Sequence, residues 1–230
     1  MNKGIRRIFS EVPGTYELVN HVLTCGLDTL WRRKAARFAA ADGGTRWLDI
    51  CSGTGEMAVY LCRLAEDDTT IVAADFSLPM LRNLTDKSEA TRIVFTIAEA
   101  STLPFHNNTF DLVTISFATR NINVSREALI QCLREFYRIL KPGGRFVSLE
   151  TSQPPLRLFR WLFHVYVRLF VKPIGFIISG SRAAYAYLSH TIPRFYSAGE
   201  FGEIVRRAGF VKPTFKRLFF GVAAIHKAVK

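Results

Sequence analysis

The sequence predicts a doubly wound α/β sheet, and three observations support this prediction. Short apolar runs rich in β-branched residues alternate with stretches that carry a helical pattern. A loop with two glycines directly follows the first of these runs. Two further strand-like segments lie so close together near the C-terminus that they must pair antiparallel, because a parallel crossover needs more chain.

Five apolar runs have the length and composition of buried parallel strands. They are Trp47 to Cys51, Ile71 to Asp75, Ile93 to Ile97, Leu112 to Phe117 and Arg145 to Leu149. Helices are expected near Thr54 to Leu64, Pro79 to Asp86 and Arg126 to Leu140, the last with Ser125 as N-cap and "KPGG" as its stop. The tail predicts a helix over Glu200 to Arg207 and the strand pair Pro213 to Leu218 and Val222 to His226.

Charge is distributed unevenly along the 230 residues, which carry a net charge of +12. Residues 1–151 have 18 Lys and Arg against 17 Asp and Glu, whereas residues 152–230 have 13 against 2. Such a basic region attracts either phosphate backbones or anionic lipid headgroups, and composition does not choose between them. The N-terminus lacks the apolar run of an export signal, so an intracellular protein is expected. The four cysteines have no metal-type spacing, and no metal is expected.

The segment "LDICSGTGE" contains the loop that follows the first strand. Gly53 and Gly55 are present, but the third glycine of a dinucleotide-binding loop is missing, which disfavours a nicotinamide oxidoreductase. Asp75 ends its strand where an acidic side chain commonly accepts both ribose hydroxyls, although a helix N-cap is an alternative role. Asp49 has a similar alternative, because a helix N-terminus stabilises a nearby acid. A loop that needs no phosphate fits S-adenosyl-L-methionine.

Several separate blocks of sequence resemble the ubiquinone/menaquinone biosynthesis C-methyltransferase family. They include "LDICSGTGE", "LPFHNNTFDLVTISFATRNI", "LKPGGRFVSLETSQP" and an N-terminal pattern with Tyr16, Asn20, Gly26 and Trp31. The resemblance implies a seven-stranded, Rossmann-like class I methyltransferase domain over residues 1–230. Within it we expect an N-terminal helical cap (1–42) and a helical insertion (152–195).

The resemblance also implies the residues that contact S-adenosyl-L-methionine. These are Thr54 of the glycine loop, Asp75, the pair Glu99 and Ala100, and Ser116, beside Asp49, Gly53 and Gly55 from the loop itself. Glu99 stands where the family usually has Asn or Asp, so its bond to the adenine amino group must tolerate a longer side chain. The implied reaction is C-methylation of a prenylated quinol, with demethylmenaquinol as the first choice of substrate.

Arg120 and Asn121 follow the fourth strand and are the expected catalytic residues. A quinol carbon attacks a sulfonium methyl only after a hydroxyl has lost its proton, so the site must stabilise a phenolate. Arginine is a poor base, but it can stabilise this charge or orient a water. The alternative is that Arg120 pairs with a carboxylate and only holds the loop.

Residues 154–173 predict an amphipathic helix. Its basic residues fall within an arc of about 120° at 3.6 residues per turn, and the other positions are mostly aliphatic or aromatic. The basic residues are Arg157, Arg160, His164, Arg168 and Lys172. Charges at every turn disfavour a transmembrane span, whereas a helix that lies on a membrane or covers an apolar pocket fits the pattern. A core helix with a solvated basic face is the alternative.

These observations predict a cytoplasmic enzyme that associates peripherally with an anionic membrane surface at its inner face. Its expected partner is a prenylated quinol, no nucleic acid is expected, and a homodimer is allowed although the sequence does not determine the oligomeric state. An RNA or other nucleic-acid methyltransferase is the alternative function, because the basic tail would suit it. The sequence lacks the Asn/Asp-Pro-Pro-aromatic signature that grips a flipped adenine.

Overall fold

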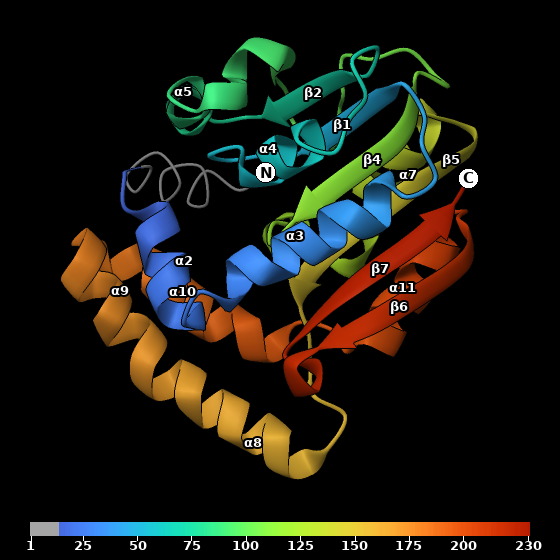
Figure 1. Cartoon of the computed structure of the whole chain (residues 1–230). Helices are drawn as coiled ribbons and strands as arrows, with labels where there is room; N and C mark the ends of the chain where they lie inside the picture. The colour runs from blue at the N-terminus through green and yellow to red at the C-terminus, as the bar shows by residue number, and fades with distance from the viewer. Residues whose placement is uncertain (1–13) are drawn as a thin grey trace.

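A seven-stranded sheet forms the centre of the molecule (Figure 1). The computed structural model describes residues 14–230. The strands lie in the order β3-β2-β1-β4-β5-β7-β6. Their bounds are β1 Arg46–Ile50, β2 Thr70–Asp75, β3 Ile93–Ile97, β4 Phe110–Ser116, β5 Leu140–Thr151, β6 Val211–Leu218 and β7 Ala223–Val229.

The first five strands are parallel, and β7 runs antiparallel between β5 and β6. The order reverses between β1 and β4, so the carboxyl ends of these strands open at a switch point of the doubly wound sheet. Both features confirm the predicted fold class, including the antiparallel C-terminal pair.

The predicted strands agree with the observed ones except at "KPGG". Helix α7 (Arg126–Ile139) begins after Ser125, whose hydroxyl accepts the N–H of Ala128 as an N-cap. However, the segment after it is the first part of β5 and not a loop. The N–H of Gly143 donates to the carbonyl of Lys230, and the register between β4 and β5 shifts there. The C-terminal residue therefore extends the strand through a contact that local sequence does not show.

Helices cover both faces of the sheet. On one face, α3 (Leu27–Ala40), α4 (Glu56–Cys62) and α5 (Leu78–Thr85) contribute to a core that includes Ala36, Leu61 and Leu84. On the other face, α7 and α11 (Ala198–Arg207) bury Phe136 and Phe201. The short helix α6 (Thr119–Ile122) and the 3-10 turns η1 (Ser88–Arg92) and η3 (Ile192–Arg194) complete the connections.

A separate helical layer lies beyond the carboxyl ends of the strands (Figure 1). It contains α2 (Tyr16–Thr24), α8 (Arg157–Tyr166), the π-helical turn η2 (Val167–Val171), α9 (Lys172–Ser179) and α10 (Arg182–Thr191). Its buried residues, among them Val19, Val171 and Tyr185, form a third apolar cluster together with Met80 of α5. By length and composition alone, Arg157–Ser179 is the one segment of residues 14–230 that could cross a membrane, and only 17% of its most apolar window is buried.

Candidate active site

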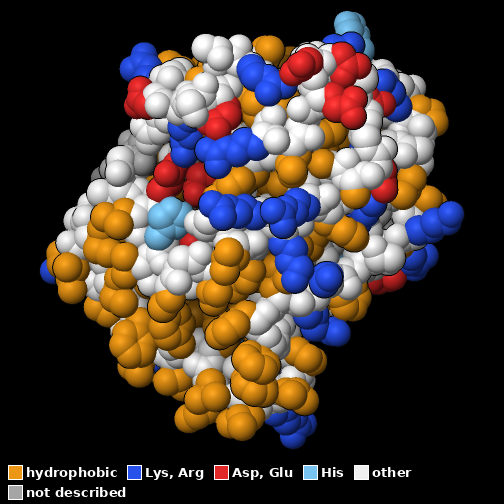
Figure 2. All heavy atoms as spheres, viewed as in Figure 1, with side chains coloured by type: hydrophobic (Ala, Val, Ile, Leu, Met, Phe, Trp, Pro, Cys, Tyr) orange, Lys and Arg blue, Asp and Glu red, His pale blue; other side chains and the backbone are white. Residues whose placement is uncertain are grey.

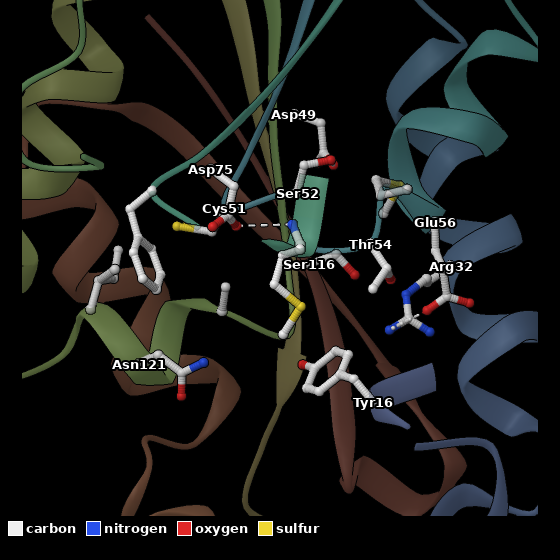
Figure 3. A pocket seen from close by; sticks show the side chains of 16 residues that line it. Tyr16, Arg32, Asp49, Cys51, Ser52, Thr54, Glu56, Asp75, Ser116 and Asn121 are labelled. Atoms are coloured by element: carbon white, nitrogen blue, oxygen red, sulfur yellow. Dashed lines mark hydrogen bonds and ion pairs between the residues drawn. The ribbon is translucent and has the colours of Figure 1, made fainter. Parts of the chain in front are cut away.

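A cleft opens at the carboxyl ends of β1, β2 and β4 (Figure 3). Its free space, including the part open to solvent, is about 640 Å³, which is within the range of ligand pockets. The side chains around it come from the sheet edge, the glycine loop and the helical layer. They are Tyr16, Arg32, Asp49, Cys51, Ser52, Gly53, Thr54, Glu56, Met57, Asp75, Phe76, Met80, Ser116, Ala118, Asn121 and Ile122.

The glycine loop turns sharply between β1 and α4. Cys51, Gly53 and Gly55 all have positive φ, at 53°, 57° and 81°. A Cβ on Gly55 would lie 2.4 Å from the side chain of Leu84, so this glycine allows α4 to pack against α5. A Cβ on Gly53 would meet no described atom within 4 Å and would instead fill part of the cleft. The two glycines therefore have different roles: Gly53 leaves room for a ligand, and Gly55 allows close packing of the helices.

Asp75 is buried and holds the loop from the neighbouring strand. One carboxylate oxygen accepts the N–H of Gly53 at 2.9 Å, and the other accepts the N–H of Ser77 at 2.8 Å. Burial raises the pKa of Asp75, while these backbone hydrogen bonds act in the opposite direction. A carboxylate offers about four lone-pair sites, so beside the backbone N–H groups of Gly53, Ser77 and Phe76 the side chain can still accept from a hydroxyl in the cleft.

Asp49 lies deeper than Asp75, with 1% of its surface exposed. Its carboxylate accepts the hydroxyls of Ser52 at 2.6 Å and Thr114 at 2.7 Å. Burial raises its pKa to about 6, despite these two hydrogen bonds. A carboxylate kept in a poorly solvated place beside a cleft is ready to interact with a positively charged ligand.

Two polar atoms at the cleft have no hydrogen-bond partner among residues 14–230. They are Oγ of Ser116, at the end of β4, and Oδ1 of Asn121, on α6. Buried polar atoms are almost always paired, so an orphan pair that lines one cleft indicates a ligand with matching donors. Figure 3 shows Asn121 and Tyr16 on the side of the cleft opposite Asp49 and Asp75.

Arg120 lies behind Asn121 and does not line the cleft directly. It is 7% exposed, and its Nη1 is 3.2 Å from Oε1 of Glu150, which is 1% exposed. The other oxygen of Glu150 accepts the backbone N–H of Arg120 at 3.0 Å. The expected alternative, a carboxylate pair that holds the loop, is thus present.

Two further observations connect Arg120 with the site. Its Nε is buried and has no hydrogen-bond partner among the described residues. The charges of Arg120 and Glu150 also act on the pKa values of Tyr16 and Tyr187, both of which burial raises. Since Tyr16 lines the cleft, the pair is within electrostatic range of a ligand bound there.

A second buried arginine, which sequence reasoning missed, enters the cleft from α3. Arg32 donates to Asp28 at 2.6 Å. It also forms an ion pair with Glu56 at 3.1 Å, and both of these side chains line the cleft (Figure 3). Ligand atoms of His21, Asp28 and Glu56 lie within 4.8 Å of one another, but the guanidinium already bridges both carboxylates. The N-terminal helices therefore close one side of the cleft.

The structure brings most of the expected cofactor residues together. Asp49, Gly53, Thr54, Asp75 and Ser116 all line the cleft. Gly55 does not line the cleft, but it allows the packing of α4 against α5 that holds the glycine loop. Glu99 and Ala100 follow β3, whose next residue, Ala98, donates its N–H to the carbonyl of Asp75. They lie beside the cleft along the sheet edge but are not among the residues that line it.

Comparisons with known proteins identify the family. The model of the ubiE/COQ5 methyltransferase family matches residues 1–230. The chain belongs to this family. It is 34% identical over 227 residues to the ubiquinone/menaquinone biosynthesis C-methyltransferase UbiE of Desulfotalea psychrophila, with 99% of this chain and 90% of the relative covered. It is 38% identical over 221 residues to the demethylmenaquinone methyltransferase of Thermus thermophilus, with 95% and 98% covered.

Solved structures show the same fold. A SAM-dependent methyltransferase from Thermotoga maritima superposes with a TM-score of 0.66 at 17% identity, covering 98% of this chain and 99% of that one. Another from Aquifex aeolicus gives 0.60 at 16% identity, covering 86% and 88%. The chain is therefore an S-adenosyl-L-methionine-dependent C-methyltransferase of quinone biosynthesis, as the sequence predicted. Nothing in these comparisons favours a nucleic-acid methyltransferase.

The residues present fit this cofactor. The space above Gly53 would be filled by any side chain, and the Ser116 hydroxyl lacks a described partner. Asp75 can hold ribose hydroxyls, and Asp49 offers a carboxylate to the positively charged part of the molecule. No anion-binding loop is needed, because the cofactor carries no phosphate.

Proposed function

We propose that this enzyme methylates a ring carbon of a prenylated quinol, with demethylmenaquinol as its substrate and menaquinol as its product. The observation that carries this proposal is a pair of buried polar atoms, one on Asn121, which lines the cleft, and one on its sequence neighbour Arg120. Nε of Arg120 and Oδ1 of Asn121 lack partners among residues 14–230, although both residues lie in the family-specific segment "ISFATRN". A ring that bears hydroxyl groups would supply the missing partner of Asn121 and would bring the phenolate within electrostatic range of Arg120.

The chain's own residues would prepare the ring for attack. When bound, S-adenosyl-L-methionine supplies an electrophilic methyl group. The Arg120 guanidinium, held by Glu150, stabilises the phenolate that forms as a quinol hydroxyl loses its proton. The Asn121 amide orients the ring, and Tyr16 covers it from α2. Apolar neighbours such as Met80 and Ile122 exclude water, which strengthens the electrostatic effect of the arginine.

The third apolar cluster provides a route for the prenyl tail. Tyr16, Phe76 and Met80 line the cleft and also pack against this cluster, which continues to Val167 and Val171 below the surface of the helical layer. An apolar path thus runs from the ring site to the exposed helices. This arrangement supports a substrate with a long hydrocarbon tail over a polar one.

Such a substrate stays in the bilayer, so we also propose that this cytoplasmic enzyme binds the inner membrane surface peripherally. The basic residues of the predicted amphipathic helix support this. Arg157, Arg160, Arg168 and Lys172 are all exposed. His164 instead bonds to Gln153 at 2.7 Å and is half-buried, so it belongs to the inner side of α8.

The substrate class can be tested by methyl transfer from labelled S-adenosyl-L-methionine. The purified enzyme is incubated separately with a short-tailed demethylmenaquinol, the matching demethylated benzoquinol and total RNA. We expect label in the naphthoquinol, and faster transfer to it than to the benzoquinol. Label in RNA, or none in either quinol, would overturn the proposal.

A further inference from the structure

Five exposed apolar side chains gather where α8 begins and where the β6–β7 hairpin turns. Leu156, Leu158 and Trp161 are 62%, 63% and 61% exposed, and Phe219 and Phe220 are 57% and 63% exposed. We call these five residues the apolar corner. Figure 2 shows hydrophobic side chains gathered over the lower part of the molecule, where Figure 1 places α8 and the hairpin tip. Apolar patches of this kind usually mark an interaction surface.

The two segments of the apolar corner form one unit. The ring of Phe220 stacks on that of Phe159 in α8, with centroids 4.5 Å apart and planes 6° apart. The turn also abuts the linker before α8, since a Cβ on Gly221 would lie 2.8 Å from Pro155. The N–H of Ser152 donates to the carbonyl of Val222 at 2.8 Å. These contacts hold the exposed rings in place.

Backbone strain at the hairpin tip is the second observation. Phe219 and Phe220 have φ values of 41° and 53°, in the left-handed region that aromatic residues rarely adopt. Strain of this kind costs on the order of 1 kcal/mol or more per residue and persists mainly where a function requires it. At the hairpin tip, this strained backbone directs two phenylalanine rings outward. Their exposure to water is itself unfavourable, so solvent does not offset the strain.

The apolar corner lies at the same edge of the sheet as the active-site cleft. Strand β5 is parallel to β4, and both end at the carboxyl edge, where Ser116 and Thr151 lie. Thr151 pairs with Ala223, the first residue of β7, so the hairpin turn between β6 and β7 is at this edge. A surface that contacted the apolar corner would therefore face the side of the molecule that receives the substrate.

The charges of the chain segment that begins at the apolar corner select the kind of surface. No Asp or Glu occurs between Glu150 and Glu200, whereas this stretch contains six Lys and Arg, all exposed. They are Arg157, Arg160, Arg168, Lys172, Arg182 and Arg194. Basic residues next to an exposed tryptophan and phenylalanines match an anionic lipid surface, in which aromatic rings prefer the interface.

From this combination we propose that the apolar corner inserts into the interfacial layer of an anionic bilayer and orients the cleft toward it. The strained pair Phe219 and Phe220 is the wedge, and α8 lies beside it with Trp161 at the level of the headgroups. The inference rests on the proposed function in one respect only, which is that the substrate is a bilayer lipid. The basic residues attract the enzyme to the surface, whereas the wedge determines its depth and orientation.

The test is the double variant Phe219→Asn, Phe220→Gly, because Asn and Gly tolerate positive φ and should preserve the turn. Binding is measured by co-sedimentation with vesicles of phosphatidylcholine and phosphatidylglycerol. We expect the partition coefficient to fall about tenfold or more, with unchanged or higher thermal stability. Trp161 fluorescence, isolated by comparison with Trp161→Phe, should be quenched by lipids brominated on their acyl chains in the wild type and much less in the variant.

A matched control removes an exposed apolar pair at the other end of the sheet, Val94→Thr with Phe95→Thr in β3. Its vesicle binding should match that of the wild type. The proposal would be overturned if the wedge variant bound vesicles as well as the wild type, or if Trp161 were not quenched. It would also be overturned if the wild type formed a dimer and the wedge variant did not, and this result would assign the apolar corner to contact with a second copy. Failure of the wild type to methylate any soluble quinol would instead overturn the proposed function and leave the binding result intact.

Discussion

Apolar residues are buried in the central strands of the sheet, whereas those of α8 in the helical layer are exposed or only half-buried. In the sheet, Leu48, Leu112 and Phe146 are wholly inaccessible, with no exposed surface between them. In α8, where four of the ten residues are Leu or Phe, no residue is buried. A buried apolar residue stabilises the fold, whereas an exposed one offers binding energy to something else. The difference supports the proposal that the sheet edge carries the chemistry and the helical layer contacts the bilayer that holds the substrate.

The largest expected effect is a loss of methyl transfer with no change in membrane binding. Arg120→Lys keeps the positive charge but cannot keep the guanidinium geometry at Glu150, so phenolate stabilisation is lost. We expect kcat on a soluble quinol to fall by about 100-fold or more, while cofactor affinity and vesicle binding remain normal. Arg126→Lys, at the exposed start of α7, is the control. Wild-type turnover of Arg120→Lys would reduce this arginine to a support of the loop.

Reversal of charge in the helical layer should produce the opposite result. Each basic residue near an anionic surface contributes about 1 kcal/mol, so changing Arg160, Arg168 and Lys172 to Glu, which also adds repulsion, should reduce vesicle binding by at least about 100-fold. Binding of the wild type should also weaken with added salt. The same change of charge in the exposed residues Arg33, Lys34 and Arg37 of α3 serves as the control. If both triple variants lose binding equally, only net charge matters and α8 has no special place.

A smaller effect concerns the cofactor half of the cleft. Asp75→Ala removes two charge-assisted hydrogen bonds to the ribose, and we expect calorimetry to show at least about tenfold weaker cofactor binding. The same carboxylate also holds Gly53 and Ser77, so Asp75→Asn, which keeps one acceptor oxygen, should have an intermediate affinity. Unchanged affinity in folded Asp75→Ala protein would contradict the assignment.

The smallest effect is on stability and comes from Asp49. Its pKa is raised to about 6 in the folded state, above its unfolded value of about 4, so the folded state holds the proton more tightly. This contribution is complete below pH 4 and is lost as the pH rises to about 6. The Tm of the wild type should therefore fall by a few degrees relative to that of Asp49→Asn over this interval. Parallel plots of Tm against pH for the two proteins would show that burial does not raise the pKa of Asp49 in the folded state.

The sequence allowed the sheet to be predicted well, because its strands are buried on both faces and their β-branched runs are visible locally. The Asp75 position and the glycine loop follow directly from this pattern. By contrast, the entry of Arg32 and Glu56 into the cleft depends on how α3 packs against α4, which has no local signal. Tyr16 was part of a family-specific pattern, but only the fold shows that it lines the same side of the cleft as Asn121 (Figure 3).

Three further features escaped prediction for physical reasons. The π-helical turn over Val167–Val171 shifts the helix phase before Lys172, and the bond of His164 to Gln153 is a contact outside the helix that a helical wheel does not show. The hairpin turn has positive φ at Phe219 and Phe220 as well as at Gly221, and aromatic residues give no local signal of this conformation. The partner of Arg120, Glu150, lies 30 residues away on the neighbouring strand.

The most direct test of the account is the ratio of two initial rates, one on long-tailed demethylmenaquinol in anionic vesicles and one on a short-tailed analogue in solution. The Arg160, Arg168 and Lys172 triple Glu variant should lower the first rate and leave the second unchanged, so that the ratio falls by about the loss in vesicle binding. Arg120→Lys should lower both rates and leave the ratio unchanged. If the triple variant loses both rates equally while it remains folded and binds cofactor, the helical layer belongs to the catalytic pocket and the proposed division between chemistry and membrane contact is wrong.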